Sequence, residues 1–270
     1  MIRHTTLLAT PDLEVHRVEH PAGHLHRDPE EESSDTYAIS FVERGSFSIR
    51  SRYGAGQLRP GDVLITRPGD VYSCRHAEPY PDDVCLSVTW RRRAIEEDRD
   101  SRQLVQASRP RMVIGPSNRL RYLRWRLDRL LSGPDTRVAA EGLALALWRA
   151  LLDPSRRLYR ERQVWWYAER VEAARELMHQ RFADDLSLAA LARAVGMSSH
   201  HFCRIFAELA GVPPHRYLLE VRLRVAADLL RQGASVTDAC FRSGFQNLSH
   251  FIRLFHRRFG VTPSRLAASP

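Results

Sequence analysis

The first ninety residues alternate between apolar and polar positions in short runs, which is typical of half-buried β-strands. Pro60-Gly61 and Pro68-Gly69 mark turns on either side of one such run. The predicted strands cover residues 37–42, 46–50, 62–66 and 84–90. Several short strands with frequent turns between them predict a small β-barrel or sandwich.

Beyond Trp90 the spacing of apolar residues changes to that of helices. After a charged connector, one helical stripe is formed by Leu120, Leu123, Leu127, Leu130 and Leu131. The next helix, about residues 136–152, is apolar nearly all round, so it must be buried on two sides. We interpret it as a dimer interface and expect a homodimer through about residues 116–152. Burial inside its own domain is the alternative.

The last ninety residues contain an internal repeat. The pattern Phe-x-Arg-x-Phe at residues 202–206 recurs at residues 251–255, an offset of 49. Upstream the offset is 48, as between Gly196 and Gly244. One residue has therefore been inserted in the turn of the second copy.

Each copy fits a helix-turn-helix motif, over about residues 187–208 and 235–257. A serine can cap the first helix, a small residue lets the two helices approach, and a glycine suits a turn with positive φ. These positions are Ser187, Ala192 and Gly196 in the first copy and Ser235, Cys240 and Gly244 in the second. A longer helix from Pro214 to about Gln232 joins the two motifs and fixes their separation.

Charge is divided unevenly along the chain. All 41 basic residues of the 270 are arginine, and with 32 acidic residues they give a net charge of +9. Residues 1–90 carry a net −5, residues 91–182 a net +9, and residues 183–270 a net +5. Lysine is absent even from the acidic part, which indicates coding bias. The basic remainder favours a polyanionic partner.

Two further classes of protein are disfavoured. The N-terminus has no long apolar core, and residues 142–152 are too short and too charged to span a bilayer, so we expect no signal peptide and no membrane segment. The four cysteines form no regular framework. We therefore expect a reduced, cytoplasmic protein without disulfides.

The C-terminal repeat resembles the DNA-binding domain of AraC/XylS-type transcriptional regulators. The resemblance covers about residues 165–268 and includes the Gly244-Phe245 turn and the Gly-x-Thr-Pro-Ser-x-Leu ending at residues 260–266. It implies two recognition helices presented to successive major grooves, which lie about 34 Å apart. It also implies RNA polymerase as a partner, and activation rather than repression.

We predict DNA contacts from the outward positions of this domain. Arg204 and Arg253 suit bidentate contacts to guanine. The other predicted base contacts are Ser199, His200, Cys203, Ser249 and Ile252. The predicted phosphate contacts, which set affinity rather than sequence preference, are Arg222, Arg224, Arg257 and Arg258.

The N-terminal strands, with PGDVLITRPGD at residues 60–70 and a following His76, resemble a cupin, the usual effector-binding domain of this family. Cupin enzymes hold a metal on a His-x-His-x3-4-Glu cluster and a later His. Here Tyr72 stands where that later His is expected. We therefore expect a metal-free effector pocket made by His24, His26, Tyr37, Tyr72 and His76. The alternative is a metal on His24, His26, Glu30 and His76, with Glu31 or Glu32 as substitutes for Glu30.

Together these patterns predict an α+β protein of three parts. They are a cupin-like effector-binding domain (1–110), a helical dimerisation or linker segment (111–162), and an all-α DNA-binding domain (163–270). We interpret the chain as an effector-responsive transcriptional regulator that binds double-stranded DNA and needs no cofactor. A metal-dependent cupin enzyme with an appended DNA-binding domain, and a ligand-independent architectural DNA binder, stay open.

Overall fold

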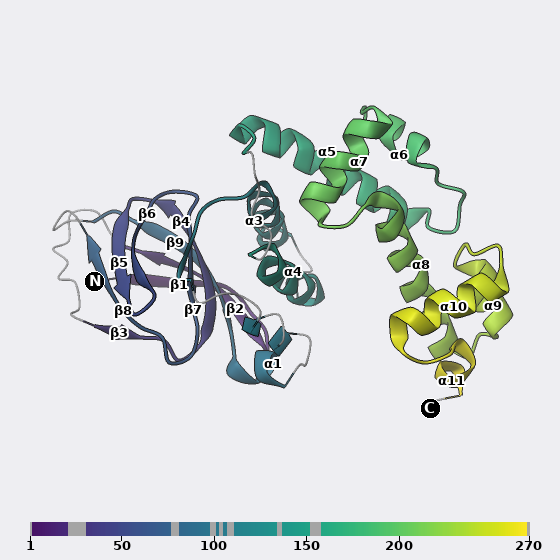
Figure 1. The fold of residues 1–270 in the computed structure, drawn as a ribbon, viewed down its shortest axis with the longest axis horizontal. Coiled ribbons are helices and arrows are strands. Elements are labelled where there is room, and N and C mark those ends of the chain that lie inside the picture. Colours follow the sequence, from purple (N-terminus) through teal and green to yellow (C-terminus); the bar gives the residue numbers. More distant parts are fainter. Residues whose placement is uncertain are drawn as a thin grey trace. The chain divides into compact units, whose positions relative to one another are not determined.

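Figure 1 shows the protein as a computed structural model. It describes residues 2–20, 31–76, 81–97, 101–102, 105–106, 111–133, 137–151 and 158–268. The chain divides into two compact units, Met1–Tyr159 and Arg160–Pro270. All described strands lie in the first unit and the helix-turn-helix motifs lie in the second, which confirms the predicted α+β class.

The first unit is built on two antiparallel sheets. The six-stranded sheet has the order β1 (Arg3–Ala9), β2 (Leu13–Glu19), β9 (Val84–Trp90), β4 (Tyr37–Arg44), β7 (Val63–Thr66) and β10 (Val113–Ile114). The four-stranded sheet has the order β3 (Glu32–Ser33), β8 (Val71–His76), β5 (Phe47–Ser51) and β6 (Gly54–Leu58). The predicted strands correspond to β4, β5, β7 and β9.

Apolar side chains of both sheets form a core between them. This core contains Val42, Phe47, Ile49, Leu58, Leu64 and Met112. The strict alternation in β5 buries Phe47 and Ile49 and exposes Ser48 and Arg50, as its period of two predicts. The sheets therefore enclose an interior into which every second residue of a strand points.

Helices cover the outer face of the six-stranded sheet (Figure 1). They are α1 (Arg92–Glu96), α3 (Asn118–Leu131) and α4 (Arg137–Ala150). Trp148 of α4 is 1% exposed, and its ring lies 5.5 Å from that of Trp90. Leu143, Ala144 and Leu147 are also buried, so this unit itself covers much of the apolar surface of α4. Gly142, Leu145, Ala146 and Arg149 form the exposed or partly exposed stripe of its described side chains.

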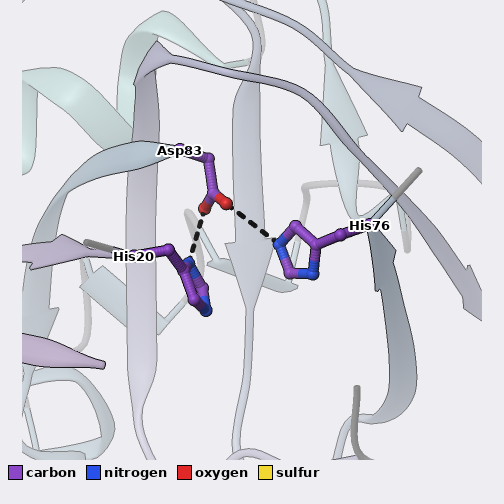
Figure 2. Close-up of side chains that lie close together, drawn as sticks. All are labelled: His20, His76 and Asp83. Atoms are coloured by element: carbon purple, nitrogen blue, oxygen red, sulfur yellow. Dashed lines mark hydrogen bonds and ion pairs between the residues drawn. The ribbon is translucent and has the colours of Figure 1, made fainter. Parts of the chain in front are cut away.

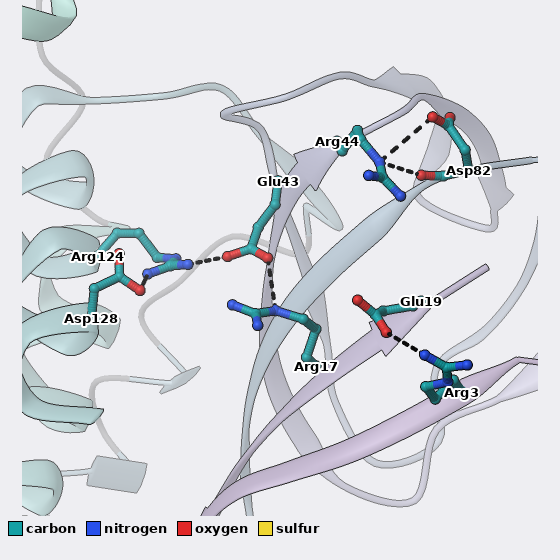
Figure 3. Close-up of polar contacts among 8 residues, drawn as sticks. All are labelled: Arg3, Arg17, Glu19, Glu43, Arg44, Asp82, Arg124 and Asp128. Carbon is teal, nitrogen blue, oxygen red and sulfur yellow. Dashed lines mark hydrogen bonds and ion pairs between the residues drawn. The ribbon is translucent and has the colours of Figure 1, made fainter. Parts of the chain in front are cut away.

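A charged network fastens α3 to this sheet (Figure 3). The guanidinium of Arg124 pairs with Glu43 of β4 and with Asp128 of its own helix. Arg17 of β2 approaches the other oxygen of Glu43, with 3.1 Å between Nε and Oε2. Because Arg124 and Glu43 are largely shielded from solvent, this network stabilises the packing more than an exposed pair does.

The second unit consists of helices only. They are α5 (Glu161–Gln180), α6 (Leu188–Ala194), α7 (Ser199–Ala210), α8 (Pro214–Arg231), α9 (Val236–Arg242), α10 (Leu248–Phe259) and α11 (Pro263–Ala267). The pairs α6–α7 and α9–α10 are the two predicted helix-turn-helix motifs. Phe202 and Phe206 in the first motif, and Phe251 and Phe255 in the second, are fully buried. Both phenylalanine pairs have ring centroids 5.5 Å apart.

The two turns differ by one residue. Gly196 and Gly244 both have positive φ, 67° and 86°, as predicted. In the first motif the cap of α7, Ser198, comes two residues after the glycine, whereas the cap of α10 is Asn247, three residues after its glycine. The amides of Met197 and Phe245 make equivalent bonds to Ala192 and Cys240, so the inserted residue is Gln246.

Within the described part of the chain, no helix has both the length and the apolar character needed to cross a membrane.

Candidate functional site

The first turn of α7 presents polar side chains outward. Ser198 caps the helix by accepting a hydrogen bond from the amide of His201, and Ser199 and Cys203 are partly exposed. His200 is exposed, and the side chain of Arg204 is 51% exposed with its Nη1 3.8 Å from Glu208 Oε2. An exposed ion pair of this kind contributes little to stability.

The first turns of α10 present a similar face. Asn247 accepts a hydrogen bond from the amide of His250 at 2.8 Å. Ser249 and Arg253 are exposed. Ile252, however, packs partly against the core of its own motif. Its side chain therefore contributes to stability as well as to the outer surface.

The four arginines predicted to contact phosphates have different surroundings. Arg257 is exposed and has no ion-pair partner among the described residues. Arg224 and Arg258 approach the same carboxylate, that of Glu220, at 3.2 and 2.7 Å. Arg222 donates from Nε to the carbonyl of Phe182 at 2.7 Å and from Nη2 to that of Asp184 at 2.8 Å. Burial lowers the pKa of Arg222.

The helix α8 packs against both motifs. Tyr217, near its start, contacts the ring of Phe206 of the first motif, and Leu223 and Ala226 belong to the core of the second. With 18 residues, α8 is about 27 Å long. A single helix therefore connects the two motifs and fixes their separation within this unit.

A cavity of about 450 Å³ lies inside the first unit, lined from both sheets. Its lining includes the hydroxyl-bearing residues Ser34, Thr36, Ser40, Thr66, Tyr72, Ser87 and Thr89. Its imidazoles are those of His4, His16, His20 and His76. Ser40 and Ser87 hydrogen-bond to each other at 2.8 Å, as do Ser34 and Thr66 at 3.2 Å. We call this space the sensor cavity.

The structure brings together only some of the residues predicted for an effector pocket. Tyr72 and His76 line the sensor cavity, and burial raises the pKa of Tyr72 so that its hydroxyl keeps its proton. Tyr37 is not among the lining residues. Its hydroxyl lies 3.4 Å from Glu96 and its ring meets Trp148 of α4 edge-on, so it faces the helices rather than the cavity.

Three of the predicted residues, His24, His26 and Glu30, lie outside the described residues. The two proposed substitutes for Glu30 are described. Glu31 is exposed, and Glu32 lines the sensor cavity.

The cavity also contains a cluster that the sequence analysis missed (Figure 2). Asp83 lies between two imidazoles, with Oδ2 3.0 Å from His20 Nδ1 and Oδ1 3.0 Å from His76 Nε2. Burial alone would raise the pKa of Asp83, but the hydrogen bonds and charges of the two histidines outweigh it and lower the pKa. The antiparallel pairing of strands β2 and β9 would have revealed this cluster, because His20 directly follows Glu19 and Asp83 directly precedes its partner Val84.

Two of the free thiols have raised pKa values. Burial raises the pKa of Cys85, which lines the sensor cavity, to about 12. Burial also raises the pKa of Cys240 in the core of the second motif. Both thiols are therefore protonated at neutral pH and poor nucleophiles.

Comparison with known protein families gives two matches that together span most of the chain. Residues 12–162 match the AraC-like ligand binding domain, and residues 191–269 match a helix-turn-helix domain. The chain is also 27% identical over 219 residues to YbfI of Bacillus subtilis, an uncharacterized HTH-type transcriptional regulator. That similarity covers 80% of this chain and 78% of YbfI.

Other relatives match the C-terminal unit. The HTH-type transcriptional activator RhaS of Shigella boydii is 37% identical over 97 residues, which are 36% of this chain and 35% of RhaS. A solved probable AraC family regulator from Rhodopseudomonas palustris is 31% identical, with a TM-score of 0.36, and the similarity covers 38% of this chain and 99% of that one. The DNA-binding domain of AdpA, solved with a target DNA, is 30% identical over 38% of this chain and 89% of its own, with a TM-score of 0.33.

The ligand-binding domain match alone covers more than half of the chain. It lies over strands β2 to β10 and the helices α1, α3 and α4, and the helix-turn-helix match includes α7 and α10. The chain therefore belongs to the AraC family of DNA-binding transcriptional regulators, and it is a regulator rather than an enzyme.

Proposed function

We propose that this regulator activates transcription in response to a small polar molecule that binds in the sensor cavity. The observation that carries the proposal is the combination, in one chain, of a cavity lined by hydroxyl- and imidazole-bearing residues with two capped helices whose first turns are polar and outward. The name of RhaS as an activator supports the direction of regulation. RNA polymerase is the partner that activation requires, and the cytoplasm is the proposed compartment.

We infer that α7 and α10 read bases in two successive major grooves. Their outward arginines, Arg204 and Arg253, would contact guanine, because a planar guanidinium matches the two acceptors of that base. The neighbouring contacts would come from Ser199, His200, Cys203, Ser249 and Ile252. The partial burial of Ile252 leaves only its outer surface for a thymine methyl group.

We propose that Arg257 contacts a phosphate, and that Arg224 and Arg258 do so after leaving Glu220. These two cations share one carboxylate, so their pairing leaves positive charge at the surface. Arg222 differs because two backbone carbonyls hold its guanidinium. We assign Arg222 to holding α8 against the segment before α6, with any phosphate contact secondary.

We propose that Tyr72 and His76 bind the effector together with the hydroxyls of the sensor cavity. A volume of about 450 Å³ lies within the range of small-molecule sites. Tyr72 can donate a hydrogen bond because its hydroxyl stays protonated. The many hydroxyls favour a molecule with several hydrogen-bonding groups over a purely apolar one.

We propose that two copies associate through the outer stripe of α4, within the predicted region 116–152. Gly142 and Ala146 are small enough to let two helices approach, and Leu145 is only partly buried. Deleting the helix would remove the buried Trp148 and unfold the unit, so a point change is the better test. Leu145→Glu should give monomers in sedimentation, whereas Leu130→Glu on α3 should leave the dimer intact. A dimer that survives Leu145→Glu contradicts this interface.

The decisive experiment maps the sites that the full-length protein occupies on its own genome and then measures transcription beside them. An activator predicts that transcripts beside occupied sites fall when the gene for this protein is deleted. A rise in those transcripts contradicts activation. Equal binding to an occupied site and to random DNA at the same salt concentration contradicts sequence-specific reading and favours an architectural role.

A further inference from the structure

His20, His76 and Asp83 converge at one end of the barrel from three strands and both sheets (Figure 2). His20 directly follows β2, Asp83 directly precedes β9, and His76 ends β8. The backbone amide of His20 donates to the carbonyl of Asp83 at 3.0 Å, which extends the β2–β9 ladder by one pair. The main chain therefore fixes two of these residues relative to each other.

The three side chains offer donor atoms at the separations of one coordination shell. With one ligand atom taken from each residue, these atoms all lie within 4.8 Å of one another, and each imidazole lies 3.0 Å from one of the two oxygens of Asp83. Donors about 2.1 Å from a shared ion lie roughly 3.0–3.4 Å apart. A small approach of the two imidazoles, whose ring centroids are 4.8 Å apart, would complete such a shell.

The site is shielded from bulk solvent and firmly held. The side chains of His20, His76 and Asp83 are 11%, 6% and 6% exposed, and all three line the sensor cavity. The backbone of Asp83 packs directly on Gly45, where an added Cβ would lie 2.6 Å from the Cα of Asp83. This close approach limits the movement of the carboxylate, as a preorganised ligand requires.

We propose that His20, His76 and Asp83 form a binding site for a divalent transition-metal ion such as Zn²⁺. Two imidazoles and one carboxylate are a nitrogen and oxygen donor set that suits Zn²⁺, Fe²⁺ or Co²⁺ rather than Ca²⁺ or Mg²⁺. Three protein ligands leave at least one coordination position for water or another oxygen donor from the cavity. This site shares only His76 with the cluster expected from the His-x-His-x3-Glu spacing.

The test uses the full-length chain, stripped with a chelator and titrated with Co²⁺, whose visible bands report its coordination. We expect one ion per chain, with bands of nitrogen and oxygen ligation and displacement by Zn²⁺. Asp83→Asn and His76→Gln should each weaken Co²⁺ binding by roughly 100-fold or more. Asp83→Asn keeps the shape and two polar atoms of the side chain, and unchanged circular dichroism would show that this variant is folded.

Matched controls remove other imidazoles of the same cavity. His16→Gln and His4→Gln should leave Co²⁺ affinity within about twofold of the starting protein. Three results would overturn the proposal. The first is the absence of stoichiometric Co²⁺ or Zn²⁺ binding at micromolar concentration. The second is binding that survives Asp83→Asn and His76→Gln but is lost in His24→Gln or His26→Gln. The third is a sulfur-to-cobalt charge-transfer band, which would place Cys74 or Cys85 at the ion.

Discussion

At the scale of single residues, Arg253 and Arg257 stand one turn apart on α10, and both are exposed. Arg253 belongs to the first half of the helix, beside Ser249, where base edges are within reach in a helix-turn-helix complex. Arg257 lies in the last turn, where we propose that it contacts the sugar-phosphate backbone. An arginine side chain is therefore expected to have a different energetic role at each of these two positions.

Alanine substitution separates these roles. Arg253→Ala should cost about 1–3 kcal/mol on the cognate site and relax the preference at one base pair. Arg257→Ala should weaken binding uniformly on all sequences and reduce the slope of log K against log salt by about one. Fluorescence anisotropy on a panel of single-base variants at several salt concentrations measures both. Uniform weakening by Arg253→Ala would make that residue a phosphate contact.

Cys203 offers a second residue-scale test, because it lies partly exposed on the proposed reading face of α7. We expect a maleimide to label Cys203 in the free protein and to label it several-fold more slowly when a specific DNA site is bound. Cys240 is the internal control, since it is fully buried and burial raises its pKa. Peptide mass spectrometry resolves the two thiols. Labelling of Cys203 that DNA leaves unchanged would place this face away from the DNA.

At the scale of elements, the sequence patterns predicted those helices and turns whose structure is determined by residues close together in the chain. The repeat predicted both motifs, because their buried phenylalanines and turn glycines recur at a fixed offset. Strand β1 was missed, because six of its seven residues are exposed and no apolar alternation marks it. The residue type of Tyr37 predicts a place in the cavity, but alternation along β4 turns this side chain, with that of Ile39, to the helix-covered face.

The cluster of His20 and Asp83 illustrates what a sequence without strand register cannot show. The two residues are 63 positions apart, and only the pairing of Glu19 with Val84 brings them together. The prediction of a metal cluster therefore relied on histidines close in sequence, His24 and His26. Long-range register, rather than spacing, decides which side chains share this cavity.

The turn glycines give a matched pair for measuring backbone strain. A Cβ at Gly196 meets nothing within 4 Å, so Gly196→Ala should cost only the strain of positive φ, about 1–3 kcal/mol. A Cβ at Gly244 would lie 2.8 Å from the Cα of Ala183, so Gly244→Ala should cost roughly 1–3 kcal/mol more. Amide hydrogen exchange of the intact variants, followed in the peptides that cover α7 and α10, measures the local stability of each motif. Equal losses would show that the contact with Ala183 relaxes at little cost.

At the scale of the whole molecule, the chain divides into two compact units between Tyr159 and Arg160. Each has its own core, so each contains the contacts needed to fold. The helices α3 and α4 belong with the strands, fastened through Arg124 and Trp148. We therefore propose that dimerisation and sensing reside in the first unit and base reading in the second, with the functional boundary near residue 160.

This division predicts the behaviour of a fragment. Residues 160–270 alone should fold, keep the base preference of the full chain, and bind a two-site promoter about 100-fold or more weakly because a dimer's second contact is lost. Binding assays on single and paired sites measure the difference. A single site, which one fragment fills, is the control and should show nearly equal affinity. A fragment that binds paired sites as tightly as the full chain would contradict a dimeric reader.

The extra residue Gln246 has a consequence for redesigning the operator preference. Because α10 begins one position later after its glycine than α7 does, the two recognition helices are not interchangeable modules. A helix transplanted from one motif to the other would present its side chains rotated by about 100° unless its own turn travels with it. Libraries that vary base preference should therefore exchange whole segments from turn glycine to C-terminal glycine, Gly196–Gly211 for Gly244–Gly260, rather than helices alone.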